Sequence, residues 1–371
     1  MARRRLVEVL GMAMATLLLA GCSSSGGGTP PAIRYFAYVT NSSGNTVSAF
    51  AVDRNSGAFT QIKGSPFATG SNPRGVLVHS SGKFVYVANA GSNNVSAYTI
   101  KSAVGTLAAS PGSPFAAGAG PWGIAGDPAG RFVYVTNYAS GTVSAYRVDP
   151  GNGSLTAVDG SPFAAGSNPT GVAVDPTGRF IYVANNGSNN VSLFVVNPGT
   201  GALTAIKAAV VNAGLYPADV AVDPTGKFVY VANNGSSTIS AYASNTSTGA
   251  LTRAGPAYAT GLNPWGVAVG HAGKCVYVAN AGDASVSAYA VNQSEGDLTE
   301  VGGSPFRAGS SPRAVAVDPT GTFLFVANYS GNSVSVYAID ASTGALSPAA
   351  DSPFGAGTRP GGIAITASTV P

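Results

Sequence analysis

Two arginines and both tryptophans of this chain share one repeated position, directly after a proline that opens a short apolar segment. In chain order, this position is occupied by Arg74, Trp122, Thr170, Ala218, Trp265, Arg313 and Gly361. Two arginines can hold a carboxylate or phosphate by paired hydrogen bonds, and tryptophans stack on sugars, rings or cations. Together with Arg359, just before the last of these prolines, the residues predict a binding site for a small anion, a glycan or a protein partner.

A tetrapeptide that recurs seven times defines the register of this position. It reads YVTN or YVAN six times and FVAN once, and its copies begin at Tyr38, Tyr86, Tyr134, Tyr182, Tyr230, Tyr277 and Phe325. The spacing is 48 residues in every interval but one, which is 47. A period of this size indicates an array of one supersecondary unit, so the fold follows from one repeat.

The repeat from Pro169 to Gly214 reads as four short strands separated by turns. Residues 171–174 are apolar, residues 180–184 and 191–196 are aromatic and β-branched, and residues 202–208 form a weaker fourth segment. Asp175-Pro176-Thr177-Gly178 suits a type I turn between the first two. Four antiparallel strands in a repeat of this length are typical of a propeller blade.

The two ends of the repeat array predict how the ring closes. The motif at Tyr38 has no innermost strand before it, and the last innermost strand, residues 362–365, has nothing after it. Pairing the two gives one blade with three N-terminal strands and one C-terminal strand. We therefore expect an all-β, seven-bladed β-propeller over residues 34–371, with no free strand at the closure.

The first residues are typical of an export signal. Arg3, Arg4 and Arg5 precede a mostly apolar run that ends at Leu19-Ala20-Gly21-Cys22, which resembles the lipobox of bacterial lipoproteins. The resemblance implies a signal peptide over residues 1–21, lipidation of Cys22 and anchoring to the cell envelope. Residues 22–33 would be a Ser/Gly/Pro tether, and Ser23 favours the outer over the inner membrane. The alternative is a plain signal peptide with a coincidental cysteine.

Charge and cysteine content narrow the partners of the mature chain. Without residues 1–21 the chain has 16 basic and 14 acidic residues, a net charge of +2, and no basic stripe, so we expect no nucleic-acid partner. Cys275 is the other cysteine, and it stands where most repeats have phenylalanine, so it predicts a buried thiol and no disulfide. We expect a monomer.

Polar residues present in most repeats predict architecture rather than chemistry. The asparagine that ends each motif is expected to bond the backbone of the turn that follows it. The turn aspartates Asp127, Asp175, Asp223 and Asp318 lie on separate repeats, so we expect no metal site and no cofactor. His79 and His271 fall on the same turns, where we expect both to be solvated.

The YVTN repeat resembles the YVTN family of surface propellers and the lactonase family, which includes bacterial 6-phosphogluconolactonases. This resemblance implies a histidine two residues after an opening proline, a glutamate after one motif asparagine, and nearby arginines. The histidine positions read Gly75, Gly123, Gly171, Asp219, Gly266, Ala314 and Gly362. The glutamate positions read Ser42, Ala90, Tyr138, Asn186, Asn234, Ala281 and Tyr329. Only Pro73-Arg74 and Pro312-Arg313 remain of that pattern, and Asp219 is the one group that the comparison leaves at this ring for acid–base catalysis.

The variable position predicts an arc of residues around one channel mouth. Taken around the ring, Trp265, Arg313, Gly361, Arg74 and Trp122 are consecutive, with the arginines inside and the tryptophans outside, and Tyr138, Tyr216 and Tyr329 on loops at the same face. These residues either form a ligand site or plug the channel.

Three functions are compatible with these residues. The missing histidine and glutamate favour a non-catalytic envelope lipoprotein that binds a ligand or partner. One alternative is a lactone hydrolase that uses Asp219 and the arginines, and the other is a structural or adhesive surface protein.

Overall fold

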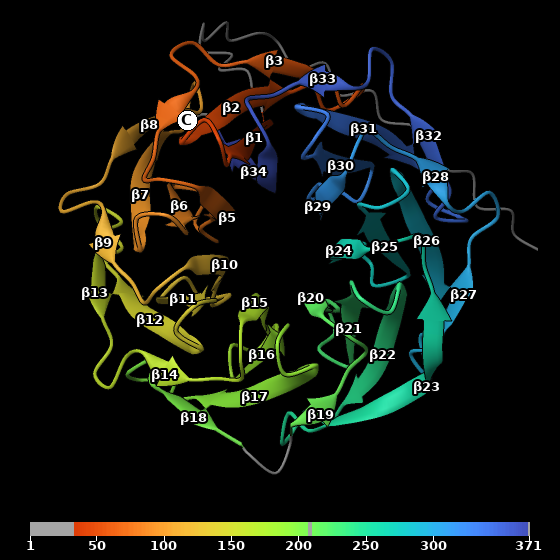
Figure 1. Cartoon of the computed structure of the whole chain (residues 1–371). Helices are drawn as coiled ribbons and strands as arrows, with labels where there is room; N and C mark the ends of the chain where they lie inside the picture. The colour runs from red at the N-terminus through yellow and green to blue at the C-terminus, as the bar shows by residue number, and fades with distance from the viewer. Residues whose placement is uncertain (1–32, 207–209, 370–371) are drawn as a thin grey trace, which may run out of the picture.

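Seven four-stranded sheets stand around a central channel in the computed structural model, which describes residues 33–206 and 210–369 (Figure 1). All regular structure within these ranges is β, so the predicted seven-bladed propeller is confirmed. No helix in the described ranges has the length and apolar character needed to cross a bilayer. The predicted signal peptide, Cys22 and all of the tether except Ile33 lie outside the described residues.

Each blade begins at the channel and runs outward through antiparallel strands. The innermost strands are β5 (Pro73–Val78), β10 (Pro121–Gly126), β15 (Pro169–Val174), β20 (Pro217–Val222), β24 (Pro264–Val269), β29 (Pro312–Val317) and β34 (Pro360–Thr369). The second strands carry the repeated motif and are β1 (Ile33–Asn41), β6 (Phe84–Asn89), β11 (Phe132–Asn137), β16 (Phe180–Asn185), β21 (Phe228–Asn233), β25 (Cys275–Asn280) and β30 (Phe323–Asn328).

The outer half of each blade holds the two remaining strand positions. The third strands are β2 (Thr46–Val52), β7 (Asn94–Lys101), β12 (Thr142–Val148), β17 (Asn190–Val196), β22 (Thr238–Ser244), β26 (Ser285–Val291) and β31 (Ser333–Ile339). The fourth strands are β3 (Phe59–Gln61), β8 (Thr106–Ala109), β13 (Leu155–Ala157), β18 (Leu203–Ala205), β23 (Leu251–Ala259), β27 (Leu298–Glu300) and β32 (Leu346–Pro348). We number the blades 1 to 7 by the motif they carry, so blade 1 contains β1.

The outer edge differs from the single fourth strand that the sequence predicted. In six blades this edge resumes as a second short piece, namely β4 (Phe67–Ala68), β9 (Phe115–Ala116), β14 (Phe163–Ala164), β19 (Val211–Asn212), β28 (Phe306–Arg307) and β33 (Phe354–Gly355). Five of these interruptions contain a Ser-Pro pair whose serine hydroxyl accepts a third-strand amide hydrogen bond, as Ser161 Oγ does from Ala145 N at 2.9 Å. The hydroxyl replaces the carbonyl that a continuous strand would supply.

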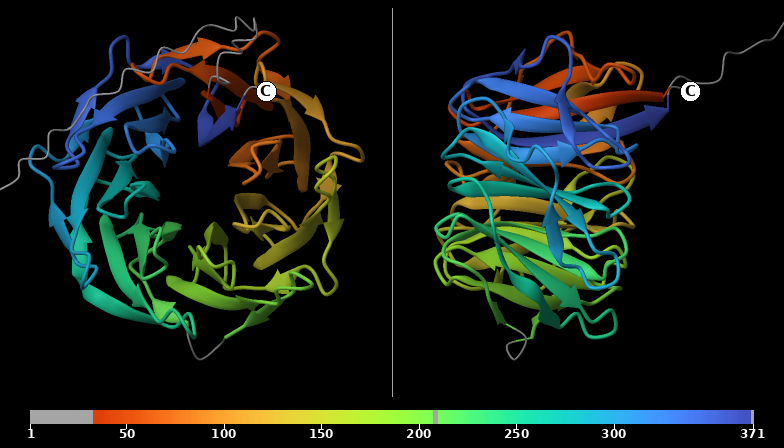
Figure 2. Two further views of the ribbon diagram at one scale, coloured as in Figure 1. Left: turned by 180° about the vertical axis from the view of Figure 1, so that it is seen from behind. Right: turned by 90° about the vertical axis from the view of Figure 1, so that its right-hand side faces the viewer.

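The ring closes as the sequence predicts. Strand β34 from the C-terminal end pairs antiparallel with β1, and Ala37 lies opposite Ile365 in this register. Both strands belong to blade 1, which therefore ties the two ends of the chain together (Figures 1 and 2). The closed ring leaves no innermost strand unpaired among the described residues.

The hydrophobic core lies between neighbouring blades rather than inside one sheet. Seven apolar clusters each join two adjacent blades, as where Phe84 and Tyr86 of blade 2 pack with Val133 and Val135 of blade 3. Six motif tyrosines also donate a hydrogen bond of 2.9 to 3.4 Å to a glycine carbonyl of the next blade. In the seventh motif Phe325 has no hydroxyl, and its ring stacks on Phe59 of blade 1 with centroids 5.3 Å apart.

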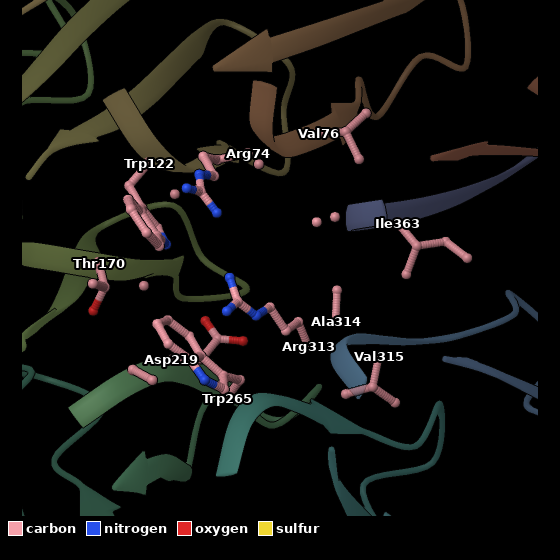
Figure 3. A pocket seen from close by; sticks show the side chains of 16 residues that line it. Arg74, Val76, Trp122, Thr170, Asp219, Trp265, Arg313, Ala314, Val315 and Ile363 are labelled. Atoms are coloured by element: carbon pink, nitrogen blue, oxygen red, sulfur yellow. The ribbon is translucent and has the colours of Figure 1, made fainter. Parts of the chain in front are cut away.

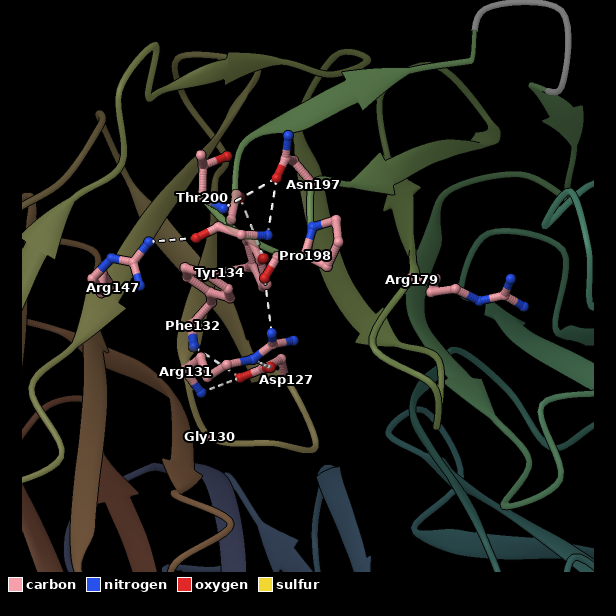
Figure 4. Close-up of polar contacts among 12 residues, drawn as sticks. Asp127, Gly130, Arg131, Phe132, Tyr134, Arg147, Arg179, Asn197, Pro198 and Thr200 are labelled. Carbon is pink, nitrogen blue, oxygen red and sulfur yellow. Dashed lines mark hydrogen bonds and ion pairs between the residues drawn. The ribbon is translucent and has the colours of Figure 1, made fainter.

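The turn aspartates fix the start of the second strand. Asp127 is buried, and its Oδ1 accepts a hydrogen bond from Phe132 N at 2.8 Å. Arg131 forms an ion pair with Asp127 Oδ2 at 3.1 Å and donates to the carbonyl of Pro198 in the next blade at 2.8 Å (Figure 4). These aspartates are structural, as the sequence predicts.

Two polar groups have other partners than the sequence suggested. In all seven repeats the motif asparagine donates from Nδ2 to the third-strand serine seven residues later, at 2.8 to 3.0 Å, rather than to the backbone of the turn that follows. His79 is buried instead of solvated, with its Nδ1 2.7 Å from Ser81 Oγ and its Nε2 donating to Gly130 O at 2.8 Å. His271 is exposed, as predicted.

Tyr182→Phe tests the inter-blade hydrogen bonds. The Tyr182 hydroxyl contacts Gly249 O at 2.9 Å and Ser244 Oγ at 2.8 Å in the next blade. Its loss should lower the free energy of unfolding by about 1 kcal/mol in urea denaturation. The matched change Tyr216→Phe, at an exposed loop residue, should stay within about 0.5 kcal/mol of wild type. Equal effects of the two changes would contradict this role for the hydrogen bond.

Candidate functional site

The variable residues of the innermost strands gather around one cavity at the channel mouth. The cavity has a volume of about 180 Å³, and its lining includes Arg74, Trp122, Asp219, Trp265 and Arg313. In the close-up view these five side chains extend from different blades toward the channel (Figure 3). Of the five residues predicted to bind a ligand, Arg359 alone is not part of the cavity lining. It is exposed on the loop before β34.

The two tryptophans meet each other, which the predicted arc did not suggest. Their rings stack with centroids 6.1 Å apart and an interplanar angle of 17°, and Tyr138 lies against Trp122 at 5.2 Å. Between them around the ring stand the small, buried residues Thr170 and Ala218. Small side chains on these two blades leave room for the indoles to lean together, so the tryptophans cover this side of the mouth.

Aromatic rings hold both arginine heads in place. The Arg74 guanidinium lies over Trp122 at 4.4 Å from the ring centroid, and that of Arg313 over Trp265 at 4.9 Å. Arg313 also lies over Tyr329 at 3.6 Å, and Arg359 approaches the same ring at 5.8 Å. Tyr329 therefore belongs to the site, although the sequence placed it only on the same face.

No carboxylate of the described residues forms an ion pair with the arginine cluster. Arg74 and Arg313 are half-buried, and the Nε atom of each is buried without a hydrogen-bond partner. Burial lowers the pKa of both guanidinium groups, while Tyr329 opposes the shift. Repulsion from Arg74 and Arg359 lowers the pKa of Arg313 further. Among residues 33–206 and 210–369 the one ion pair is Arg131–Asp127, on the turn at the opposite end of β10 from Trp122.

Asp219 is the one acid among the residues that line the cavity. It lies on β20, and its carboxylate accepts hydrogen bonds from Val220 N at 2.9 Å and from Val267 N of the next blade at 3.1 Å. Burial raises the pKa of Asp219 to about 7, although the two amides oppose this shift. Asp219 can therefore exchange a proton near neutral pH.

Side-chain hydroxyl groups of neighbouring blades hydrogen-bond the backbone of the residues at the channel mouth and so hold it in position. Thr40 Oγ1 donates to Arg74 O at 2.6 Å and Thr136 Oγ1 to Thr170 O at 2.6 Å, while Ser42 Oγ donates to Pro73 O at 2.8 Å. Thr40 and Thr136 are the variable third residues of two motifs, where the other five have alanine. The sequence signal for these two hydrogen-bonding threonines was the difference between YVTN and YVAN.

The positions where the resemblance implies a histidine are closely packed. A Cβ atom at Gly75 would lie 2.6 Å from Trp122 O, and one at Gly171 would lie 2.6 Å from Asp219 Oδ1. Side chains at these two positions would require the neighbouring blade to shift. The cavity lining includes neither histidine nor glutamate.

The pKa of Asp219 predicts how stability depends on pH. Because that pKa is raised from 3.8 to about 7, the folded protein holds the proton more tightly than the unfolded chain does. Its stabilising contribution is complete below about pH 4 and is lost as the pH rises through about 7. Asp219→Asn should therefore gain stability over wild type between about pH 4 and 8, by up to ~4 kcal/mol.

Urea denaturation across this pH range measures the gain, with Asp351→Asn on an exposed loop as the matched control. The control should track wild type at every pH. A difference between Asp219→Asn and wild type that does not change with pH would contradict the raised pKa.

Comparison with known proteins supplies the family. The model of the family described as lactonase, seven-bladed β-propeller, matches residues 33–114, 109–264 and 256–358. A putative 6-phosphogluconolactonase from Bacteroides fragilis is 21% identical over 90% of this chain and 98% of that chain, with a TM-score of 0.78. A periplasmic gluconolactonase from Pseudomonas aeruginosa is 21% identical over 92% and 100%, with a TM-score of 0.77.

A functionally unknown protein from Desulfotomaculum acetoxidans is 17% identical over 89% of this chain and 98% of that chain, with a TM-score of 0.68. No curated protein matches in sequence. At these identities the solved structures share the fold, and fold does not fix activity. Because the matched segments span most of the sequence, the chain belongs to the lactonase family of seven-bladed β-propellers.

Proposed function

We propose that this protein is a cell-envelope lipoprotein, anchored through Cys22, whose propeller binds a small carboxylate or phosphate anion at the channel mouth without converting it. The observation that carries the proposal is the group of three arginines, two of them half-buried, with no carboxylate in an ion pair with them. Outer-membrane placement follows from Ser23 after the lipidated cysteine.

The energetics of the cluster favour a bound anion. Partly burying a guanidinium costs solvation that only a hydrogen-bonded partner or counter-charge offsets. The buried Nε atoms of Arg74 and Arg313 have no such partner in the part of the chain that the structure describes. A carboxylate or phosphate between the two arginines would accept paired hydrogen bonds from each planar fork.

The geometry of the cluster makes it ready to bind. Trp122 fixes the plane of Arg74, and Tyr329 with Trp265 fixes that of Arg313. A held side chain loses less conformational entropy when the ligand arrives, so more of the contact energy becomes affinity. The exposed Arg359 can approach from the loop above and add a third positive charge.

Lactone hydrolysis is a second candidate, and Asp219 is the observation that favours it. An acid with a pKa of about 7 in this cavity is suited to activate a water molecule, and the arginines could stabilise the negative charge that develops on the lactone oxygen. Two of the solved relatives carry the names 6-phosphogluconolactonase and gluconolactonase. The hydrolase would then act on a sugar or dicarboxylic acid lactone.

Arg74→Gln and Arg313→Gln test anion binding. Each change removes a charge-assisted contact of about 1.5–3 kcal/mol, so each should weaken binding of 6-phosphogluconate, gluconate or inorganic phosphate by roughly 10- to 100-fold in titration calorimetry. Arg179→Gln, on the outer turn where Arg179 bonds Thr246 O, is the matched control and should bind as wild type does. Unaltered affinity in the two rim variants would contradict the proposal.

Thermal unfolding of the same variants distinguishes a binding site from a plug. Because Arg74 and Arg313 repel each other, losing one charge should leave the melting temperature within a few degrees of wild type. A collapse of stability would show that the rim residues mainly close the channel.

A lactone panel tests the second candidate. Wild type and Asp219→Asn should both leave 6-phosphogluconolactone and gluconolactone to hydrolyse at the uncatalysed rate, measured by proton release. Turnover by wild type that Asp219→Asn abolishes would overturn the non-catalytic proposal in favour of hydrolysis. Binding in the calorimetric assay is read independently, so the two outcomes are distinguishable.

A further inference from the structure

Blade 6 lacks an aromatic ring that every other blade has. The second strand of six blades has phenylalanine two residues before the first residue of the motif, namely Phe36, Phe84, Phe132, Phe180, Phe228 and Phe323, whereas blade 6 has Cys275. In those six blades the ring lies directly against a glycine of the next blade, where a Cβ atom would overlap the ring. In blade 6 the Cys275 thiol faces the equivalent Gly344.

A cavity lies beside this smaller side chain. It has a volume of about 250 Å³ and lies between blades 6 and 7, lined by Cys275, Tyr277, Gly321 and Ile339, with His271 and Lys274 among the other lining residues. The turn of residues 270–274 follows the outer end of β24, so this cavity lies at the opposite end of the strand from Trp265. It is therefore separate from the anion site.

We propose that this cavity is a binding site for a small molecule that carries a phenyl ring. The other six blades show what the position accommodates, since a phenyl ring packs there against a bare glycine and, in blades 2, 3 and 7, against the aromatic ring of the motif. An apolar cavity of about 150 Å³ is enough to hold benzene, so this one accepts a ring with a short substituent. The ligand supplies the ring that the sequence omits.

Neighbouring side chains favour an aromatic over an aliphatic occupant. Arg131 and Arg179 stand one residue before the phenylalanine in their blades, and each guanidinium lies over that ring, at 5.4 Å and 5.1 Å. Lys274 holds the same position before Cys275 and lines the cavity. A lysine ammonium and a polarisable sulfur, both in the cavity lining, interact favourably with an aromatic ring.

Ligand-dependent melting of the purified protein tests this site. Benzyl alcohol at saturating concentration should raise the melting temperature by about 2 °C or more, while cyclohexylmethanol should give a smaller shift. Cys275→Phe fills the cavity with its own ring, so it should raise the melting temperature without ligand and abolish the shift with benzyl alcohol. If the Cys275→Phe variant does not fold, Cys275→Leu takes its place. Leucine fills the cavity only partly, so this variant should reduce the shift with benzyl alcohol.

The location of the ligand is read from a crystal soaked with 4-bromobenzyl alcohol, whose anomalous bromine signal should lie between Cys275 and Ile339. The double change Arg74→Gln with Arg313→Gln should keep the full benzyl alcohol shift, because it alters only the channel mouth. No shift in wild type, an equal shift in Cys275→Phe, or bromine bound elsewhere would overturn the proposal.

Discussion

The contact between a phenyl ring of one blade and a bare glycine of the next is the constraint on which the ring depends. These glycines have positive φ, from +72° to +80° where the six rings meet them, and a side chain at any of them would overlap the ring. The neighbouring motif tyrosine adds a hydrogen bond to the carbonyl of five of these glycines, and Tyr277 donates in the same way to Gly344. Both partners recur at six of the seven blade boundaries, so most blades meet the next in the same way, and the boundary between blades 6 and 7 has Cys275 in place of the ring. One motif has phenylalanine instead of tyrosine and therefore lacks this hydrogen bond. There the ring of Phe325 stacks on Phe59 of the next blade instead.

The residues that pack one blade on the next are nearly the same in every repeat, whereas the residues at the channel mouth differ. This difference explains why the candidate functional residues lie at the mouth. The residue after each opening proline is held through its backbone, as in the bonds from Thr40 to Arg74 O and from Thr136 to Thr170 O. Its side chain lies at the channel mouth and outside the seven apolar clusters between blades, so several residue types are accommodated there. Tryptophan, arginine, threonine, alanine and glycine all occur there. At the channel mouth the repeated fold therefore tolerates a different side chain on each blade, and a specific binding site requires such different side chains.

The register of the motif was enough to predict the blades, the closure of β34 on β1 and the set of rim residues, because each follows from spacing alone. It could not predict which rim side chains touch. Trp122 and Trp265 are three blades apart in the chain, and they stack only because Thr170 and Ala218 between them are small and the ring turns them toward each other. Burial was equally out of reach for His79, since its partner Gly130 belongs to the next blade. Contacts across a blade boundary depend on three-dimensional geometry, whereas contacts within a blade depend on a local pattern that the sequence displays.

The electrostatics of the mouth connect the two candidate functions. Asp219 is held largely away from water and titrates near neutral pH, while Arg74, Arg313 and Arg359 repel one another close by. An anion that binds the arginines would cancel part of their field and add its own negative charge, and both effects favour the protonated form of Asp219. A general base must be ionised to accept a proton, so a bound anion would suppress the activity that Asp219 could otherwise support. A neutral lactone would leave the carboxylate ionised, and the charge of the molecule at the mouth therefore determines whether this site holds its ligand or can act on it.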